Sequence, residues 1–494
     1  MCGIAALFSP DSRPLSELIR NMTETVRHRG PDDEGFAIFS LRELAPMTLG
    51  GRATPAAVYT ADIPYAPRRY DGSIPHAAAA LGHRRLSIID LGPSGHQPMC
   101  TSDRQLWIVY NGEIYNYLEL REELKVLGHS FVSNGDAEVI LAAYREWGDN
   151  CLARFNGMFA FVLVDRAQKK ILAARDRFGV KPLYYWRSRE GLLAFASEIK
   201  QFTVLPGWRA CLNGQRAYEF LNWGLLDHTA ETLFTGVRQL RGGESIHCSL
   251  ENLMAGPPIK RWYGLTPRLC DKNMKAAGDE LCALFTDAVR LRLRADVQVG
   301  SCLSGGLDSS SIVCVVNQML RLAGMVSKQN TFSACAKVKR YDERDFIDIV
   351  VAHTGARAHY TYPDVTELFE MIDAITWHQD EPFGSTSIFA QWEVFRLAAN
   401  KGVRVMLDGQ GADELLAGYH NYFAPRFVSL LRSCQWARLW QEMREMKGLH
   451  QYSMLWTLQQ TLNSVLPEFL RQPLRRLTGY TGIATPWLDM EKLS

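Results

Sequence analysis

The chain has 494 residues, of which 47% are hydrophobic and 22% are charged. The length predicts about two to four domains. The proportions of hydrophobic and charged residues are those of a soluble globular protein, and they exclude disordered, collagen-like and coiled-coil proteins. Lysine and arginine total 55 against 53 aspartates and glutamates, so the net charge of +2 gives no support to nucleic-acid binding.

Neither the cysteines nor the N-terminus indicates export or membrane insertion. The 11 cysteines are an odd number, spread from Cys2 to Cys434 without a CxxC pair, which favours free thiols in a reducing compartment. The N-terminus has no basic region before its short apolar run, and the apolar run at 158–164 is far shorter than the roughly 20 residues of a membrane helix. We expect a cytoplasmic protein with no zinc site and no membrane span.

The first 200 residues predict short antiparallel strands. Runs rich in β-branched and aromatic residues are separated by Asn-Gly and related turn sequences, which is the pattern of hairpins. Two helical stretches, at 117–126 and 137–147, are long enough to cover a face of a sheet. Examples of the predicted strands are residues 107–110, 159–164, 171–174, 183–186 and 192–196.

From about residue 275 the pattern changes to strands that alternate with helices. The predicted elements are a helix around 281–288, a strand at 297–303, a helix at 309–320, and strands at 331–336 and 403–407. We expect Asp342 to cap a further helix that runs to His353. This alternation predicts a doubly wound parallel sheet, whose ligands bind at the carboxyl ends of its strands.

The segment between the two halves is less regular. It contains Gly-Gly at 242–243 and Pro-Pro at 257–258, and we interpret residues 213–265 as a connection. The predicted domains are therefore residues 1–212 and 266–494, joined by this segment.

Cys2 is the first candidate functional residue. If Met1 is removed, Cys2 carries both a thiol and an α-amine, and an α-amine with an ordinary pKa near 7.7–8.0 can act as a base near neutral pH. A nucleophile that brings its own base is the arrangement of N-terminal-nucleophile hydrolases. A cysteine at this position also occurs without any function, so other residues must support the role.

Four short motifs supply such support. They are RHRGPD at 27–32, GHRRLSI at 82–88, NGEIYN at 111–116 and GDAE at 135–138. Each alone also fits an ordinary turn, hairpin or helix N-cap. Together they offer what a glutamine-hydrolysing pocket requires: a guanidinium for the α-carboxylate, a carboxylate for the α-ammonium, and an amide and a backbone N–H for an oxyanion.

With these motifs the first half resembles the glutaminase domain of class II glutamine amidotransferases, specifically of the asparagine synthetase family. Further matches are FNGMFAF at 155–161, RDRFGVKPLYY at 175–185 and FASEIK at 195–200. The resemblance implies an α+β N-terminal-nucleophile hydrolase fold, an αββα sandwich. It implies Cys2 as nucleophile, Asn111 and Gly112 as the oxyanion hole, and Arg85, Glu113 and Asp136 as ligands of glutamine, with Arg85 chosen over Arg84 by the family pattern HxRLSI.

A serine- and glycine-rich loop follows the predicted strand at 297–303. Residues 304–310 read SGGLDSS, and a helix begins after them. Gly305 and Gly306 allow a phosphate close to the backbone, and the helix N-terminus and the serine hydroxyls supply donors. The loop lacks the lysine of a Walker A motif, and the Gly-Gln-Gly at 409–411 does not continue into a dinucleotide-binding fingerprint.

This loop resembles the SGGxDS motif of ATP-pyrophosphatases, which adenylate a carboxylate and release pyrophosphate. An aspartate in an anion site needs a cation, and Mg²⁺ favours carboxylate and phosphate oxygens. The second half is thereby identified as an α/β PP-loop ATPase domain. The resemblance implies ATP and pyrophosphate binding by Leu303, Ser304, Gly305, Gly306, Asp308, Ser309, Ala334 and Gly409, and Mg²⁺ binding by Asp308 and Asp413.

Together the two halves predict an amide-forming ligase. Glutamine would be hydrolysed at Cys2, and the ammonia would attack an acyl-adenylate of an acceptor carboxylate, for which L-aspartate is one candidate. Asparagine synthetases commonly carry an acidic residue where this chain has Gln410, so another carboxylate stays open. Family members often form homodimers, and we expect no nucleic-acid or membrane partner.

The resemblance covers about residues 2–490, and a second departure from the family concerns its C-terminal end. The family has a later SxExRVPFLD motif and a lysine, which neither the segment around residues 486–488 nor Lys401, Lys447 or Lys492 matches, so we expect the family's C-terminal end to be lacking. Two alternatives therefore remain: a glutaminase or half-enzyme with an impaired synthetase step, and a catalytically silent scaffold. The retained glutamine-pocket residues count against the scaffold.

Overall fold

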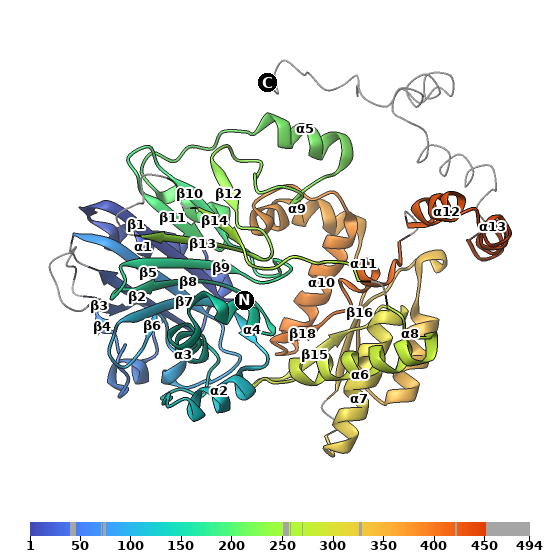
Figure 1. Ribbon diagram of the computed structural model, residues 1–494, viewed down its shortest axis with the longest axis horizontal. Helices are drawn as coiled ribbons and strands as arrows, with labels where there is room; N and C mark the ends of the chain where they lie inside the picture. The colour runs from blue at the N-terminus through green and yellow to red at the C-terminus, as the bar shows by residue number, and fades with distance from the viewer. Residues whose placement is uncertain are drawn as a thin grey trace. The chain divides into compact units, whose positions relative to one another are not determined.

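The computed structural model describes residues 1–39, 46–70, 72, 76–249, 256, 258–268, 270–325, 329–419 and 422–450 (Figure 1). The chain divides into two compact units, residues 1–407 and 408–494. Residues 486–488 and Lys492, on which the expected lack of the family's end partly depends, lie outside the described residues, as does the side chain of Lys447. Within the described part, no helix has the length and apolar character to cross a membrane.

The N-terminal half of unit 1 contains an eight-stranded sheet with one helix on its outer face. In spatial order its strands are β12 (Val237–Gln239), β10 (Tyr184–Arg187), β11 (Leu193–Ala196), β1 (Gly3–Arg13), β5 (Ala77–Arg85), β2 (Asp33–Phe39), β3 (Met47–Gly50) and β4 (Arg68–Arg69). All neighbours are antiparallel except β3 and β4. Helix α1 (Leu15–Glu24) packs on β1 and β5.

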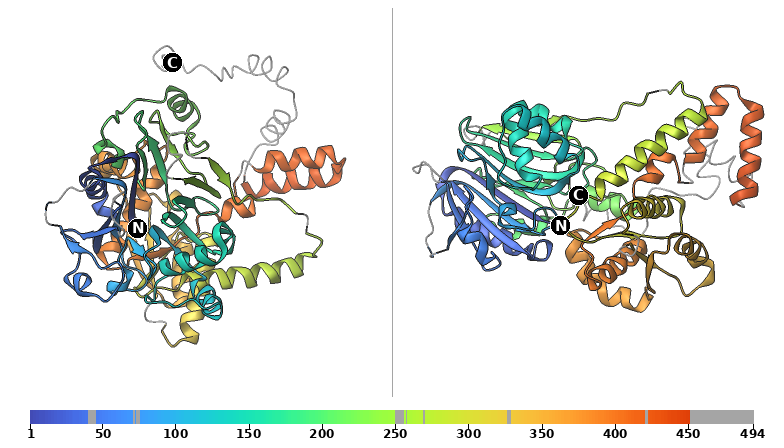
Figure 2. Two further views of the ribbon diagram at one scale, coloured as in Figure 1. Left: turned by 60° about the vertical axis from the view of Figure 1, so that its left-hand side comes forward. Right: turned by 90° about the horizontal axis from the view of Figure 1, so that it is seen from below.

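A six-stranded antiparallel sheet lies against the first one (Figures 1 and 2). Its order is β14 (Ile259–Arg261), β13 (Glu244–Ser249), β9 (Lys170–Arg175), β8 (Gly157–Asp165), β7 (Leu106–Ile114) and β6 (Met99–Cys100). Helices α2 (Tyr117–Val126), α3 (Ala137–Trp147) and α4 (Cys151–Arg154) follow β7, and α3 packs on β6 and β7. The expected αββα sandwich is thus confirmed.

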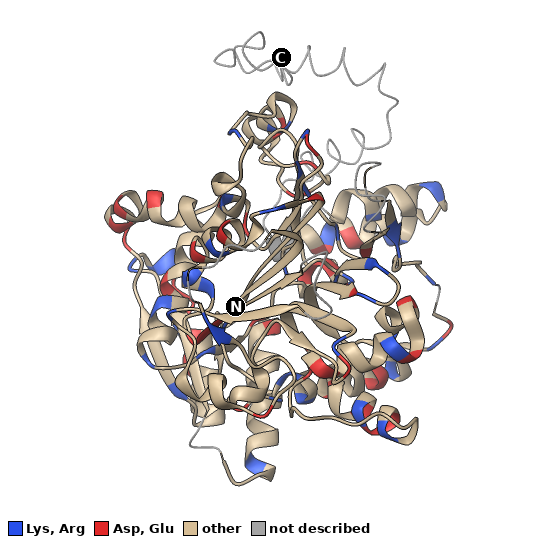
Figure 3. Ribbon diagram, turned by 90° about the vertical axis from the view of Figure 1, so that its left-hand side faces the viewer, with Lys and Arg blue, Asp and Glu red and all other residues tan. Residues whose placement is uncertain are grey.

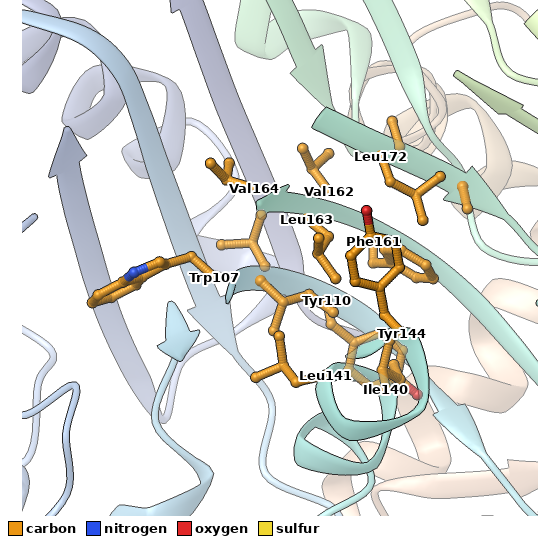
Figure 4. Packing of buried hydrophobic residues seen from close by; sticks show 14 of the residues in the cluster. Trp107, Tyr110, Ile140, Leu141, Tyr144, Phe161, Val162, Leu163, Val164 and Leu172 are labelled. Atoms are coloured by element: carbon orange, nitrogen blue, oxygen red, sulfur yellow. The ribbon is translucent and has the colours of Figure 1, made fainter. Parts of the chain in front are cut away.

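The cores explain why both sheets are strongly apolar. Along β1, Ile4, Ala6 and Phe8 belong to the cluster shared with the second sheet, whereas Ala5 and Leu7 pack with α1. Successive side chains of a strand point to opposite faces of the sheet. Because both faces of β1 are buried, its sequence is apolar at successive positions instead of alternating between apolar and polar residues. Figure 4 shows the α3 side chains facing those of the second sheet in the larger cluster.

The segment predicted to be only a connection contributes three strands. β12 pairs with β10, and β13 pairs with β9 and carries β14 on its other edge. These strands are three to six residues long and lie between glycine and proline turns, so their periodicity is too short to be recognised. The two predicted helices, by contrast, coincide with α2 and α3.

The second half of unit 1 is built on a four-stranded parallel sheet, as expected. Its order is β17 (Arg357–Thr361), β16 (Asn330–Ala334), β15 (Val299–Cys302) and β18 (Val405–Leu407). Its helices are α6 (Met274–Arg292), α7 (Leu307–Leu322), α8 (Arg344–Thr354), α9 (Val365–Gln379) and α10 (Thr386–Asn400), whereas α5 (Gly214–Trp223) lies in the connecting segment. A short 3-10 helix also occurs in this half, at Lys339–Tyr341. In the first half, short 3-10 helices occur at Arg27–Arg29, Ala56–Thr60, Pro93–Gly95, Gly148–Asn150 and Ile199–Val204.

The strand order places a topological switch between β15 and β18. The chain moves from β15 outward to β16 and β17 and then returns to β18 on the other side of β15. Ligands of doubly wound sheets bind at such a point. One cap differs from the expectation: the residue before α8 is Glu343, although the Asp342 carboxylate accepts the Arg344 N–H at 3.3 Å.

Unit 2 contains three described helices, α11 (Ala412–Leu416), α12 (Phe423–Arg432) and α13 (Trp436–His450). Helices α12 and α13 pack around Phe427, Leu430, Leu439, Met443 and Met446.

Basic and acidic residues are interspersed over the ribbon in the view of Figure 3, in keeping with the near-zero net charge.

Candidate functional site

Cys2 lies where β1 begins, beside the end of β5. Its Sγ accepts a hydrogen bond from the Leu86 N–H at 3.4 Å, and its carbonyl oxygen accepts one from Arg29 Nε at 2.9 Å. The RHRGPD turn fits closely here, since a Cβ on Gly30 would lie 2.3 Å from the carbonyl carbon of Arg84. The thiol is thus held between two of the predicted motifs.

The environment of the chain's α-amine suits a base. Burial lowers the pKa of the Met1 amine to about 5; the neighbouring Cys2 opposes this effect, and Arg29 and Lys181 add to it. Burial of this kind favours the uncharged form of an amine, which is the form that accepts a proton.

Arg85 and Arg84 have contrasting surroundings. Arg84 is paired with the carboxylates of Glu34, at 2.7 Å, and Glu24. Arg85 instead donates to backbone carbonyls, Nη1 to Gly92 at 3.1 Å and Nη2 to Ile89 at 3.3 Å. Among the described residues no carboxylate pairs with Arg85, so this buried guanidinium retains an uncompensated charge for an anionic ligand.

Asn111 carries a buried donor without an acceptor. It lies on β7, is 1% exposed, and its Nδ2 has no hydrogen-bond partner among the described residues. Gly112 follows, and a Cβ there would lie 2.3 Å from the carbonyl oxygen of Met158, so only glycine fits against β8. A buried amide without an acceptor is costly, which indicates a ligand oxygen at this point.

The carboxyl groups of half-buried Glu113 and buried Asp136 interact electrostatically. Burial, followed by the charge of Asp136, raises the pKa of Glu113 well above its ordinary value, and its Oε2 has no partner in the described part. Asp136 is the residue immediately before α3, but its side chain makes no capping hydrogen bond to that helix. Its Oδ2 instead accepts from Tyr110 Oη at 2.6 Å and the Ile114 N–H at 2.8 Å. Two carboxyls that are costly to ionise together are suited to an ammonium ligand.

The nucleotide-loop candidates after β15 are also brought together. Gly305 has φ +84°, and a Cβ there would lie 2.9 Å from that of Phe346. The Ser304 and Ser309 hydroxyls are 3.0 Å apart, and Ser304 Oγ accepts the Gly306 N–H at 3.3 Å. Leu303 is buried before the loop, and Asp308 lies in the first turn of α7, whose leading N–H groups have no helical acceptor.

The buried hydroxyl of Ser310 has no partner in the described residues, which leaves one further donor at this loop. Ala334 ends the neighbouring strand β16. Gly409 and Asp413 belong to unit 2, where the Gly409 carbonyl accepts the Ala412 N–H at 3.3 Å and a Cβ on Gly418 would meet Asp413 Oδ1.

The chain matches two protein families in succession. The glutamine amidotransferase domain family matches residues 70–263, and the asparagine synthase family matches residues 280–480. A protein of Methanocaldococcus jannaschii, assigned as its second glutamine-hydrolysing asparagine synthetase, is 32% identical over 85% of this chain and 76% of its own length. The chain belongs to the family of glutamine-hydrolysing asparagine synthetases.

Other members and structures are more distant. The amidase chry2 of Gibberella zeae is 29% identical over 86% of this chain, which spans only 60% of that family relative. Glutamine phosphoribosylpyrophosphate amidotransferase of Bacillus subtilis matches with 14% identity and a TM-score of 0.39, over 82% of this chain and 90% of its own.

One pocket residue was missed from the sequence. Lys181 lies in the RDRFGVKPLYY motif, which was recognised as typical of the asparagine synthetase family without a role for this residue. Burial lowers the pKa of its amine, while Glu113 opposes that change and Arg29 adds to it. Its backbone N–H binds the Asp176 carboxylate at 3.0 Å. Lys181 lies between β9 and β10, and nothing in the local sequence indicates that it lies close to Cys2.

The family implies Mg²⁺, and the donors present are of the appropriate kind. Asp308 is a partly exposed carboxylate beside hydroxyls and free N–H groups suited to phosphate oxygens. In the ranges that the structure covers, no three His, Cys, Asp or Glu side chains form a complete metal cluster. Mg²⁺ is usually held by one or two carboxylates together with water and nucleotide phosphate oxygens, and Asp308 is a side chain of this kind.

Proposed function

We propose that this protein is an ATP-dependent amide-forming ligase that takes its nitrogen from glutamine. The observation that carries the proposal is that two buried polar atoms, Asn111 Nδ2 and Glu113 Oε2, have no partner among the described residues; both lie on β7, which packs against β1, the strand that follows Cys2. Burying such groups is unfavourable unless a ligand completes them, so they support a pocket built for a small polar molecule.

The glutamine half-reaction follows from these groups. The α-carboxylate of glutamine binds Arg85, and its α-ammonium binds Glu113 and Asp136. The Cys2 thiol attacks the amide carbon while the α-amine freed by removal of Met1 accepts the proton. Asn111 Nδ2 and the Gly112 N–H stabilise the oxyanion. The amine returns the proton to the leaving ammonia, and water then hydrolyses the thioester to glutamate.

The synthetase half-reaction is proposed for the second half. The acceptor carboxylate attacks the α-phosphorus of ATP and gives an acyl-adenylate and pyrophosphate, which ammonia converts to an amide and AMP. Ser304, Gly305, Gly306 and Ser309 would hold the pyrophosphate, with Leu303, Ala334 and Gly409 beside the adenosine. Mg²⁺, for which Asp308 and Asp413 are the proposed ligands, would neutralise phosphate charge.

The acceptor is proposed to be a small carboxylic acid, with L-aspartate the first to test. Gln410 supports a broader choice, because a neutral amide replaces the acidic side chain common in the family at this position. A broader choice is also supported by a relative, the amidase chry2, whose name refers to a different activity.

Two assays test the proposal. Wild-type protein should release glutamate from glutamine, and it should release pyrophosphate from Mg-ATP with at least one member of a panel of carboxylic acids. Glutamate release alone would leave only a glutaminase. Absence of both activities, in protein whose Met1 is shown by mass spectrometry to be removed, would overturn the proposal in favour of a silent scaffold.

A further inference from the structure

Two side chains at the start of parallel strands reach from the synthetase half to the glutamine pocket. Asp296 lies three residues before β15, and Arg404 immediately precedes β18. Both strands start near the first half and end toward the segments proposed to hold the nucleotide. The contacts made by these two residues have no part in the half-reactions described above.

Asp296 holds the segment on which Arg85 rests. Its Oδ2 accepts the Asp90 N–H at 2.8 Å, and its own N–H donates to the Ile88 carbonyl at 2.9 Å. The carbonyls of Ile89 and Asp90 are in turn acceptors for Arg85 Nη2. Asp296 therefore fixes the backbone that orients the proposed carboxylate-binding guanidinium.

Asp90 needs such external support. Its φ of +55° is unfavourable for a residue other than glycine, and it persists only where surrounding contacts enforce it. Its carboxylate supplies some of them, by accepting the Asn134 N–H at 2.9 Å and the Ser94 hydroxyl at 2.9 Å. The bond to Asp296 is the contact that comes from the synthetase half.

Arg404 braces the adjacent segment. It pairs with Asp32 at 2.5 Å, and the same carboxylate oxygen accepts the Ser87 N–H at 2.8 Å. Asp32 also donates its N–H to the Arg85 carbonyl at 3.0 Å. Asp32 thus binds both Arg85 and Ser87. The residue between them is Leu86, whose N–H binds Cys2 Sγ.

We propose that Asp296 and Arg404 are positioning residues for glutamine hydrolysis. They contact no substrate; they hold the 85–90 segment so that Arg85 and the Cys2 thiol keep their places. The inference rests on the proposed glutaminase function. It makes the synthetase half a structural part of the glutamine site, although the two active centres lie on different sheets.

The test compares Asp296→Ala with Arg294→Ala in the full chain. Arg294 also crosses between the halves, but it binds the Tyr115 carbonyl and Glu119, outside the 85–90 segment. We expect Asp296→Ala to raise the KM for glutamine roughly tenfold with kcat changed less than about twofold, because a bond to a charged acceptor is lost. Arg294→Ala should leave both constants unchanged.

Rescue separates positioning from loss of fold. Asp296→Asn keeps an oxygen for the Asp90 N–H, so its KM should return to within about threefold of wild type, and the thermal unfolding midpoints of all three variants should agree. Arg404→Ala should lower kcat/KM by only about two- to fivefold, since the pair is partly exposed.

The outcomes are distinguishable. A wild-type protein without glutaminase activity would refute the proposed function. An active wild type in which Asp296→Ala behaves like Arg294→Ala, or in which Asp296→Asn is as impaired as Asp296→Ala, would overturn the positioning role and leave the proposed function intact.

Discussion

The proposed glutamine site and the proposed nucleotide loop differ in how deeply their residues are buried. The residues proposed to bind glutamine come from both large sheets, and the polar groups of Asn111, Glu113 and Asp136 are costly to bury or have no partner in the described part of the chain. The nucleotide loop caps a four-stranded sheet, and Ser304, Gly306 and Asp308 are at least partly exposed. A buried site is specified before its ligand arrives, whereas an exposed loop relies on the ligand and its cation to complete it.

The largest effect is expected from Cys2→Ala. Removal of the nucleophile should lower glutamine-dependent glutamate release by about a thousandfold or more. Pyrophosphate release driven by ammonium chloride and the acceptor should persist, because the nucleotide loop does not use the thiol. Loss of both activities in protein that unfolds at the wild-type temperature would contradict two separable sites.

Asn111→Ala should lower the kcat of glutamine hydrolysis by about 100- to 1,000-fold, because one oxyanion donor is lost. The thermal unfolding midpoint should not fall, since Nδ2 has no partner to lose in the described structure. A lower midpoint with normal kcat would show that the amide is structural. Asn116→Ala, which removes an exposed amide bound to the Arg154 carbonyl, is the matched control.

Asp308→Asn tests the other site. It should lower pyrophosphate release by about 100-fold, since Mg²⁺ neutralisation of phosphate charge contributes several kcal/mol, and raised Mg²⁺ should restore part of the rate. Glutaminase activity should be unchanged. Equal loss in both assays would mean that the loop and the pocket are not independent.

Glu113→Gln gives the smallest expected kinetic effect, a rise in the KM for glutamine of roughly 10- to 100-fold. The same substitution should also change how the stability of the protein depends on pH. Because burial raises the folded-state pKa of Glu113, the folded protein binds a proton more tightly than the unfolded chain. Wild-type stability therefore falls as pH rises above the ordinary carboxyl pKa of about 4.3.

The neutral glutamine side chain removes that contribution. Without ligand, Glu113→Gln should match wild type near pH 4 and be the more stable protein at pH 7–8, as measured by thermal unfolding. Bound glutamine should reverse the order at neutral pH, because its ammonium stabilises the ionised Glu113. A variant less stable than wild type at pH 8 without ligand would contradict the raised pKa.

Local sequence signals predicted part of the fold; they indicated short strands in the first half but did not locate helix α1 or the strands β1, β2 and β5. Helices α2 and α3 follow from apolar periodicity and turn residues and coincide with the structure, whereas the predicted strands overlap β7, β8 and β15 with different ends. The short strands β12–β14 were not predicted, because three to six residues beside glycines and prolines give no clear period. Their assignment depends on pairing with β9 and β10 in space.

The same distinction applies to the site. Cys2, Arg85, Asn111 and Glu113 stand in motifs with recognisable chemistry. Lys181 and the contacts of Asp296 and Arg404 involve partners far away in the chain: Asp296 binds 206 residues away, and Arg404 binds 372 residues away. No local pattern reports such a contact, and only the folded arrangement of the sheets reveals it.

The late return of the chain to complete both sheets bears on how the first half can be isolated. A fragment cut at residue 212 would leave β9 and β10 without the partners β13 and β12, and so would expose two rows of unpaired backbone donors and acceptors. Such bare edges invite self-association, so a recombinant glutaminase piece should extend at least through Arg261, where β14 ends.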